Sequence, residues 1–414
     1  MKNLKKINSI PDTLPFAAII VASLGYFVDI YDLLLFSIVR LPSLTSLGLT
    51  GPEATSKGIL LLNIQMIGLM LGGIFWGLLG DKKGRLTVLF GSILIYSLAN
   101  IANGMISNIE GFAICRFVAG FGLAGELGAG VTLVVELMPT AKRGYATTII
   151  AGVGILGAVV AHFMADIFHW RIAFFVGGGL GMALLLLRIG VSESSMFYNI
   201  KNLRTTSTNP ISLMFNKGRF KRYVKCILIG LPLWFGVGIL ITLSPEFARA
   251  MHVQGEVSAG LAIACCYGGS VIGDICSGML SQRLKSRKSA VYVFLCMLAV
   301  AMTVYLCNSG LSPFAFYSTC IFFGFAAGYW VLFITIAAEQ FGTNIRSTVT
   351  TTAPNFVRGA VVPLSLLFEL LRSYLNLSIL LSGAFVGALT LALAFYATYG
   401  TEETFSSDLD YVEE

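Results

Sequence analysis

About twelve apolar stretches follow one another along the chain, each near the roughly 20 residues that a helix needs to cross a bilayer. They are much longer than barrel strands and do not alternate between apolar and polar residues, so they predict helices. The composition agrees, because 56% of the residues are apolar and only 12% are charged, about half the charged fraction of a soluble domain. The sequence therefore predicts an all-α membrane protein of twelve transmembrane helices in a lipid bilayer.

The charge pattern and the cysteines exclude several other classes of protein. The net charge of +7 comes from 28 Lys and Arg against 21 Asp and Glu, but the basic residues lie in short clusters between apolar stretches. We therefore expect no nucleic-acid partner. The eight cysteines lack metal-ligand spacing. Because the sequence also shows no Walker loop and no metal cluster, we expect no enzyme activity, no cofactor and no metal.

The connections between the apolar stretches predict the topology. Most Lys and Arg lie in every second connection, which by the positive-inside rule places both termini in the cytoplasm and the chain in the inner (plasma) membrane. The longest polar stretch divides the apolar stretches six and six. We predict an N-terminal six-helix bundle over residues 1–191, a cytoplasmic linker over 192–222, a C-terminal six-helix bundle over 223–400 and an acidic cytoplasmic tail over 401–414.

The two halves repeat a short motif. Glu136-Leu-Met-Pro-Thr-Ala-Lys-Arg143 in the first half matches Glu339-Gln-Phe-Gly-Thr-Asn-Ile-Arg346 in the second, and a pair of threonines follows each copy. Two pseudo-symmetric bundles joined by a linker form a transporter architecture, whose substrate site lies near the midplane between the bundles.

The loop after the second stretch carries a more specific signal. Gly77-Leu-Leu-Gly-Asp81-Lys-Lys-Gly84-Arg85 resembles the signature loop of the major facilitator superfamily. The stretch from Arg116 to Glu126 is similar to the superfamily's proton symporters for sugars and organic acids. The resemblance implies a monomeric secondary transporter that works by alternating access, with Asp81 as a latch. The gate residues that it implies are Gly77, Asp81, Gly84, Arg85, Arg143, Glu136, Glu339 and Arg346.

The first apolar stretch contains two acids, Asp29 and Asp32, three residues apart and therefore on neighbouring faces of one helix. An ionised acid at this depth costs several kcal/mol unless it is paired, hydrated or protonated. We expect Arg116 to pair with Asp32 in one state and to release it on protonation, with Glu126 as a further proton-coupling candidate. A static ion pair that only joins two helices is the alternative.

A second charge deep in an apolar stretch is Arg358, close to the middle of the eleventh predicted span. Its segment resembles one in organic-anion transporters where an arginine faces the cavity, and a guanidinium matches a carboxylate with two parallel donors. We expect Arg358, Asn355, Trp234 and Tyr329 to bind the substrate. The alternative pairs Arg358 with a protein acid, and the candidates are Asp274, Glu126 and Glu339.

These residues favour a secondary active transporter that imports a small organic anion together with protons by alternating access. The alternative is a proton-driven efflux carrier for a metabolite, siderophore or drug. Exporters of the superfamily carry a Gly-x-x-x-Gly-Pro pattern in the fifth span, whereas Gly152-Val-Gly-Ile-Leu-Gly157-Ala lacks the proline. The expected partners are therefore an anionic small molecule and protons.

Overall fold

The computed structural model describes residues 13–130, 143–188, 217–307 and 309–405, and within these ranges the chain is helical without a strand. The first half forms α1 (Thr13–Ser46), α2 (Gly51–Lys83), α3 (Arg85–Met105), α4 (Ile109–Leu123), α6 (Arg143–Ile167) and α7 (Trp170–Leu187). The second half forms α10 (Lys217–Phe235), η3 (Gly236–Ile241), α11 (Ser244–Ala250), α12 (Ala259–Leu284), α13 (Arg287–Cys307), α14 (Pro313–Ala327), α15 (Trp330–Glu339), α16 (Thr343–Gly359), α17 (Val361–Ser373) and α18 (Ile379–Tyr399).

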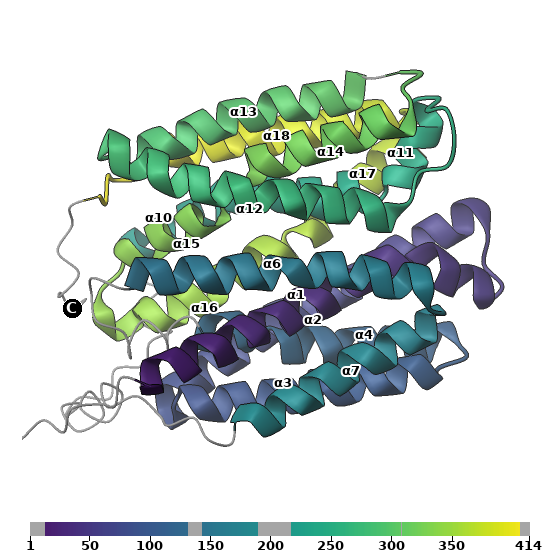
Figure 1. Ribbon diagram of the computed structural model, residues 1–414. Coiled ribbons are helices and arrows are strands. Elements are labelled where there is room, and N and C mark those ends of the chain that lie inside the picture. The colour runs from purple at the N-terminus through teal and green to yellow at the C-terminus, as the bar shows by residue number, and fades with distance from the viewer. Residues whose placement is uncertain (1–12, 131–142, 189–216, 308, 406–414) are drawn as a thin grey trace, which may run out of the picture.

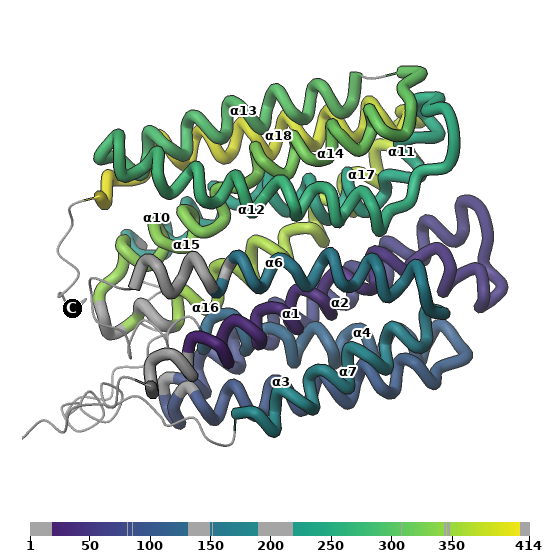
Figure 2. Tube along the Cα trace, in the orientation of Figure 1, coloured from purple at the N-terminus to yellow at the C-terminus, as the bar shows by residue number. Residues whose placement is uncertain are grey.

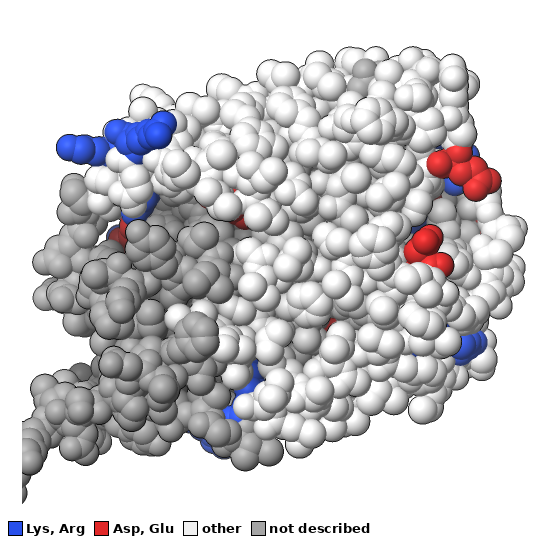
Figure 3. Space-filling view, viewed as in Figure 1, with Lys and Arg blue, Asp and Glu red and all other residues white. Residues whose placement is uncertain are grey.

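The two halves form two bundles that lie side by side (Figure 1). Among the described residues, 11 helices are long and apolar enough to cross a membrane, and Gly152–Ile167 is a shorter apolar helix. The bundles meet where α6 packs on α12 and α2 packs on α16. On the face shown in Figure 3, charged side chains gather mainly towards the two ends of the molecule and leave a broad, mostly uncharged band between them, as a bilayer requires.

We use two names for the two ends of the helix bundles. The termini end is the end where α1 begins and residues 400–405 lie, and the far end is the opposite one, where α1 turns into α2 (Figure 2). The predicted linker over 192–222 lies mostly outside the described residues. Its last part is helical, because α10 already begins at Lys217 in a basic stretch whose Lys and Arg residues favour helix.

Three of the predicted spans, each expected to be one continuous helix, are interrupted. The seventh span changes from α10 to the π-helix η3 and then to α11, the tenth breaks between α14 and α15, and the eleventh breaks between α16 and α17. Pro245 and Pro363 lie just after two of these breaks. Their missing N–H groups cannot continue the helical ladder, which favours an interruption there.

The segment that follows α18 caps a helix of its own bundle. Glu403 accepts hydrogen bonds from Ser286 Oγ (2.5 Å) and from the backbone N–H groups of Arg287 (2.8 Å) and Lys288 (3.3 Å), at the start of α13. The carboxylate satisfies N–H groups that have no partner within the helix and lies at the positive end of the helix dipole. The segment after α18 is thereby attached to the start of α13.

Replacing Glu403 with Gln is expected to destabilise this end by about 0.5 to 1 kcal/mol. Partial burial raises the pKa of Glu403, but the hydrogen bonds that its carboxylate accepts outweigh burial and hold the pKa below its usual range. Its stabilisation is therefore present above the unfolded-state pKa and is lost as the pH falls through the lower folded-state value. Thermal unfolding of the wild type and of Glu403→Gln at about pH 7 and about pH 4 measures how the difference in stability depends on pH. A difference that is equal at both pH values contradicts a stabilising role for the ionised Glu403 carboxylate.

Candidate functional site

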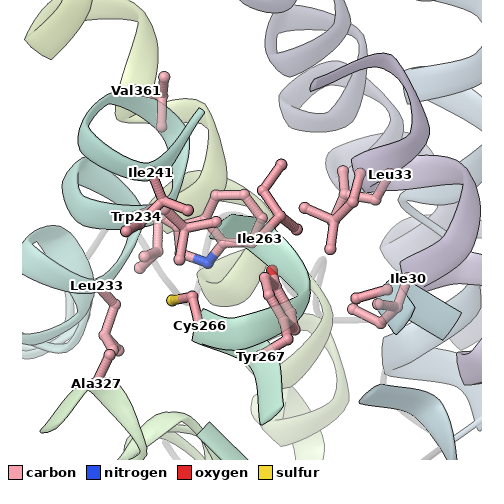
Figure 4. Close-up of a cluster of buried hydrophobic side chains, with 14 of the residues drawn as sticks. Ile30, Leu33, Leu233, Trp234, Ile241, Ile263, Cys266, Tyr267, Ala327 and Val361 are labelled. Atoms are coloured by element: carbon pink, nitrogen blue, oxygen red, sulfur yellow. The ribbon is translucent and has the colours of Figure 1, made fainter. Parts of the chain in front are cut away.

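A cavity lies between the two bundles and is lined by residues of both. Tyr26 and Ile30 of α1 form one wall, and residues of α10, α12, α15 and α16 form the facing one. Figure 4 shows Ile30 on the α1 side and Trp234 and Tyr267 on the other. The polar and aromatic residues that line the cavity are Tyr26, Trp234, Tyr267, Ser270, Asp274, Trp330 and Arg358.

Arg358 supplies the basic group of this wall. Its side chain is 1% exposed, and its Nη2 lies 3.6 Å from Oδ2 of Asp29 across the two bundles. None of its three guanidinium nitrogens has a hydrogen-bond partner among the described residues. The guanidinium also lies over the rings of Trp234 (5.4 Å) and Trp330 (5.9 Å). Arg358 thus has an ionic neighbour, but its forked donors remain available to a bound carboxylate.

The helix interruptions position these side chains. Trp234 lies at the end of α10 just before η3, Trp330 begins α15, and Arg358 is the second-last residue of α16. Interrupted helices near the midplane line the substrate sites of many transporters, because irregular backbone is tolerated there only when it faces protein or a cavity. The three breaks therefore explain why residues far apart in sequence meet at one cavity.

The two acids of α1 face different neighbours. Asp29 lies beside Arg358 of the other bundle. Asp32 instead packs against Gly177 of α7, so closely that a Cβ at position 177 would lie 2.3 Å from Asp32 Oδ1. Both side chains are fully buried, and their carboxylate oxygens have no hydrogen-bond partner among the described residues. Acids in such a setting are candidates for proton binding, because a proton removes the cost of a buried charge.

Arg116 does not form the expected ion pair with Asp32 in this structure. Its Nη2 donates to Asn100 Oδ1 (2.7 Å) and its Nε to Asn103 Oδ1 (3.3 Å), and its guanidinium lies over the ring of Phe174 (4.6 Å). Two amide oxygens of α3 and an aromatic face take the place of a carboxylate. The alternation between a paired and a released state stays a prediction.

Glu126 pairs with Arg188, a partner that was not predicted. Both Nη atoms of Arg188 donate to its carboxylate, one of them at 3.0 Å, and the two side chains are 1% and 2% exposed. Arg188 caps the end of α7. The structure thus joins Glu126 to Arg188 inside the N-terminal bundle, and not to Arg116, Asp32 or Arg358.

Two of the four predicted substrate-binding residues do not line the cavity. The Tyr329 hydroxyl donates to the backbone oxygen of Ile229 (3.0 Å), and the ring is fully buried. Asn355 Nδ2 donates to the backbone oxygens of Ala124 and Thr351 (2.9 Å each), which joins α16 to the end of α4. Neither residue lines the cavity in this structure, and a role for them in substrate binding stays a prediction.

The predicted gate is only partly described. Glu339 pairs with Arg287 (Oε1 to Nη2, 3.1 Å) and accepts a hydrogen bond from Thr404 (2.6 Å). Gly77 faces α16, and Gly84 has a φ of 98° between α2 and α3, a conformation that favours glycine. The remaining gate residues, whose side chains or whole positions lie outside the described residues, are Asp81, Arg85, Arg143, Arg346 and Glu136.

The far end contains a cross-bundle ion pair that the sequence did not indicate. Arg40 of α1 lies 2.7 Å from Glu246 of α11, with side chains 1% and 9% exposed. Thr55 donates to the same carboxylate (3.3 Å), and Ser365 of α17 donates to Asn63 of α2 (2.8 Å). These contacts join the bundles between the cavity and the far end, where a gate would have to open.

With this geometry established, comparison with known proteins decides the family. The sequence profile of the Major Facilitator Superfamily matches residues 16–365. The chain belongs to this superfamily. This member is 26% identical over 336 residues to a probable 4-methylmuconolactone transporter of Cupriavidus pinatubonensis, which covers 78% of this chain and 76% of the relative. It is 23% identical over 393 residues to a putative niacin/nicotinamide transporter of Bacillus subtilis, covering 92% and 95%.

The fold of this superfamily member is similar to solved structures as well. A structure of the xylose transporter XylE from E. coli matches with a TM-score of 0.74 at 17% identity, over 96% of this chain and 100% of the other. The profile, the relatives and the fold confirm the predicted superfamily and the all-α architecture of two bundles. The chain is a multi-pass membrane transporter of small organic substrates.

Proposed function

We propose that the protein is a proton-coupled symporter that imports a small organic anion across the plasma membrane, with both termini in the cytoplasm. The observation that carries the proposal is Arg358, a buried guanidinium on the cavity wall that lies 3.6 Å from Asp29 and makes no hydrogen bond to the described residues. A cation at this depth needs an anion, and a substrate carboxylate fits its forked donors.

Coupling follows from competition for this one cation. Asp29 lies within ion-pair distance of Arg358 and can neutralise it when no substrate carboxylate is bound. When a substrate carboxylate takes the guanidinium, Asp29 loses its counter-charge and becomes an ionised acid in a place where such a charge costs several kcal/mol. A proton on Asp29 removes that cost. Substrate and proton therefore bind together, and neither crosses the membrane efficiently alone.

The same exchange bears on the movement of the bundles. The Asp29–Arg358 pair joins α1 of one bundle to α16 of the other. Because alternating access moves one bundle against the other around a fixed site, a change of partner at Arg358 changes the balance between conformations. Arg116 and Asp32 lie deeper in the N-terminal bundle, and we propose them as a secondary proton-coupling pair.

The proposal is tested by reconstitution. Purified protein in liposomes is given an imposed pH gradient and a panel of labelled carboxylates, sugars and siderophores. The proposal predicts accumulation of a carboxylate on the alkaline side and its loss when the gradient is collapsed. Accumulation that ignores the gradient, or uptake of neutral sugars alone, contradicts it. Gradients of either polarity across oriented protein separate import from efflux.

We further propose that Arg40 and Glu246 form the far-end gate, and we expect Glu246→Gln to open it. Breaking a buried ion pair by removing one charge costs about 3 to 5 kcal/mol, because the other charge stays buried. Hydrogen–deuterium exchange should become faster in residues 40–46 and 244–250, the segments that carry the pair.

The double variant Arg40→Leu/Glu246→Leu serves as the control for this gate. Because it leaves no uncompensated charge, exchange should slow again relative to the single variant. Unchanged exchange in Glu246→Gln contradicts the gate.

A further inference from the structure

Asp274 of α12 is an acid on the cavity wall with no basic partner among the described residues. Its side chain is partly exposed to the cavity, and its Oδ1 accepts a hydrogen bond from the backbone N–H of Val331 (3.2 Å), in the first turn of α15. α15 spans 10 residues, and the Asp274 carboxyl lies at the positive end of its dipole, where a negative charge is favoured. The cavity therefore presents a carboxyl group as well as Arg358.

The other buried acids of the described residues differ from Asp274, because each either pairs with an arginine or lies away from the cavity wall. Each ion pair that involves one of them joins the acid to an arginine, and these pairs are Asp29–Arg358, Glu126–Arg188 and Glu246–Arg40. Asp32 lies in the N-terminal bundle, away from the cavity wall. Asp274 is thus the cavity acid for which the described part of the chain supplies no basic partner, and acids inside a membrane domain usually face one.

The face of α12 around Asp274 suits a positively charged group. Tyr267 and Ser270 lie seven and four residues before Asp274 and line the same cavity, as the helical repeat requires for residues on one face. An aromatic ring attracts a cation to its face, and a nearby carboxylate adds a direct charge interaction. Arg358 already lies over the rings of Trp234 and Trp330, and Tyr267 offers a further aromatic ring on the same helix as Asp274.

We propose that Asp274 binds a cationic nitrogen of the substrate, so that the cavity selects small dipolar acids whose carboxylate lies on Arg358. This inference rests on the proposed function and names its substrate class. When such a molecule is bound and Asp29 is protonated, Arg358 and Asp274 both face an opposite charge. A simple anion would leave Asp274 unpaired, and an unpaired buried charge lowers affinity.

Two pairs of isosteric probes test this selection. In each pair a cationic nitrogen replaces a carbon atom: N-methylpyridinium-3-carboxylate against 3-methylbenzoate, and 4-(trimethylammonio)butanoate against 5,5-dimethylhexanoate. Binding to the purified full-length protein is measured by quenching of tryptophan fluorescence. In at least one pair, the dipolar probe should bind about tenfold or more tightly than the anion.

Two variants separate the role of Asp274 from a structural effect. Asp274→Asn keeps an oxygen that can accept the Val331 N–H bond, so the start of α15 remains capped, but it removes the charge. We expect this variant to lose the preference to within about twofold while it still binds the anionic probe. The matched variant Asp166→Asn, at an exposed acid of α6, should keep the wild-type preference.

The inference fails if neither pair shows a preference for the dipolar probe, if no dipolar probe binds, or if Asp274→Asn retains the wild-type preference. Binding of the anionic probes alone would mean that Asp274 carries a proton instead of a ligand. The proposed function is judged separately by gradient-driven uptake of carboxylates into liposomes. It stands if that uptake persists without a dipolar preference, and it falls if no carboxylate responds to the gradient.

Discussion

Asp29→Asn is expected to abolish concentrative uptake while leaving exchange of substrate across the membrane intact. The substitution removes the only charged side chain within 4 Å of Arg358 among the described residues. The empty carrier then has an unpaired buried arginine, which makes its return across the membrane costly, whereas the substrate-loaded carrier is neutral at this point. The variant therefore becomes an obligatory exchanger.

The effect is measured with liposomes at zero membrane potential. Coupling to one proton gives about tenfold accumulation per unit of pH gradient in the wild type, and the variant should give a ratio of about one. Counterflow of labelled against unlabelled carboxylate should persist within about threefold. Asp166→Asn controls for the acid-to-amide change. Wild-type accumulation by Asp29→Asn would show that Asp29 does not couple the proton.

Arg358→Lys is expected to weaken carboxylate binding by about 10- to 100-fold. Lysine keeps the positive charge and the ion pair with Asp29, but it loses the forked pair of donors, and hydrogen bonds to charged groups contribute about 1.5 to 3 kcal/mol. It also loses the planar group that lies over Trp234 and Trp330.

Equilibrium binding of the best-transported carboxylate measures this loss, and a neutral sugar provides the comparison. Arg372→Lys, at a partly exposed arginine of α17, should bind like the wild type. If Arg358→Lys binds the carboxylate with wild-type affinity, Arg358 does not bind the substrate. If it weakens carboxylate and sugar alike, the effect is on the cavity as a whole and not on anion recognition.

The overall fold could be predicted from the sequence because a bilayer imposes one simple rule on every span. Length and hydropathy alone separate the helices, and the repeat of Glu136–Arg143 at Glu339–Arg346 indicates two related halves. The interruptions were missed because their residues remain apolar. Pro245, Gly328 and Pro363 were visible as helix breakers, and they could have identified the interrupted spans.

The pairing of charges could not be predicted in the same way. Arg358 and Asp29 were each identified by depth, but their contact depends on how the two bundles dock, which no local pattern encodes. Arg188 and Arg40 lie near the ends of apolar stretches, where arginines are usually solvated, so the sequence pattern did not indicate a buried partner for either. Their burial opposite acids of other helices appears only in three dimensions.

The central claim is that a substrate carboxylate and Asp29 compete for Arg358, and proton uptake on binding tests it most directly. Purified protein in weak buffer at about pH 7 is mixed with a saturating carboxylate, and a pH-indicator dye reports the protons taken up. The account predicts up to one proton per bound carboxylate in the wild type and none in Asp29→Asn. Binding without proton uptake in the wild type, or equal uptake in both proteins, would contradict it.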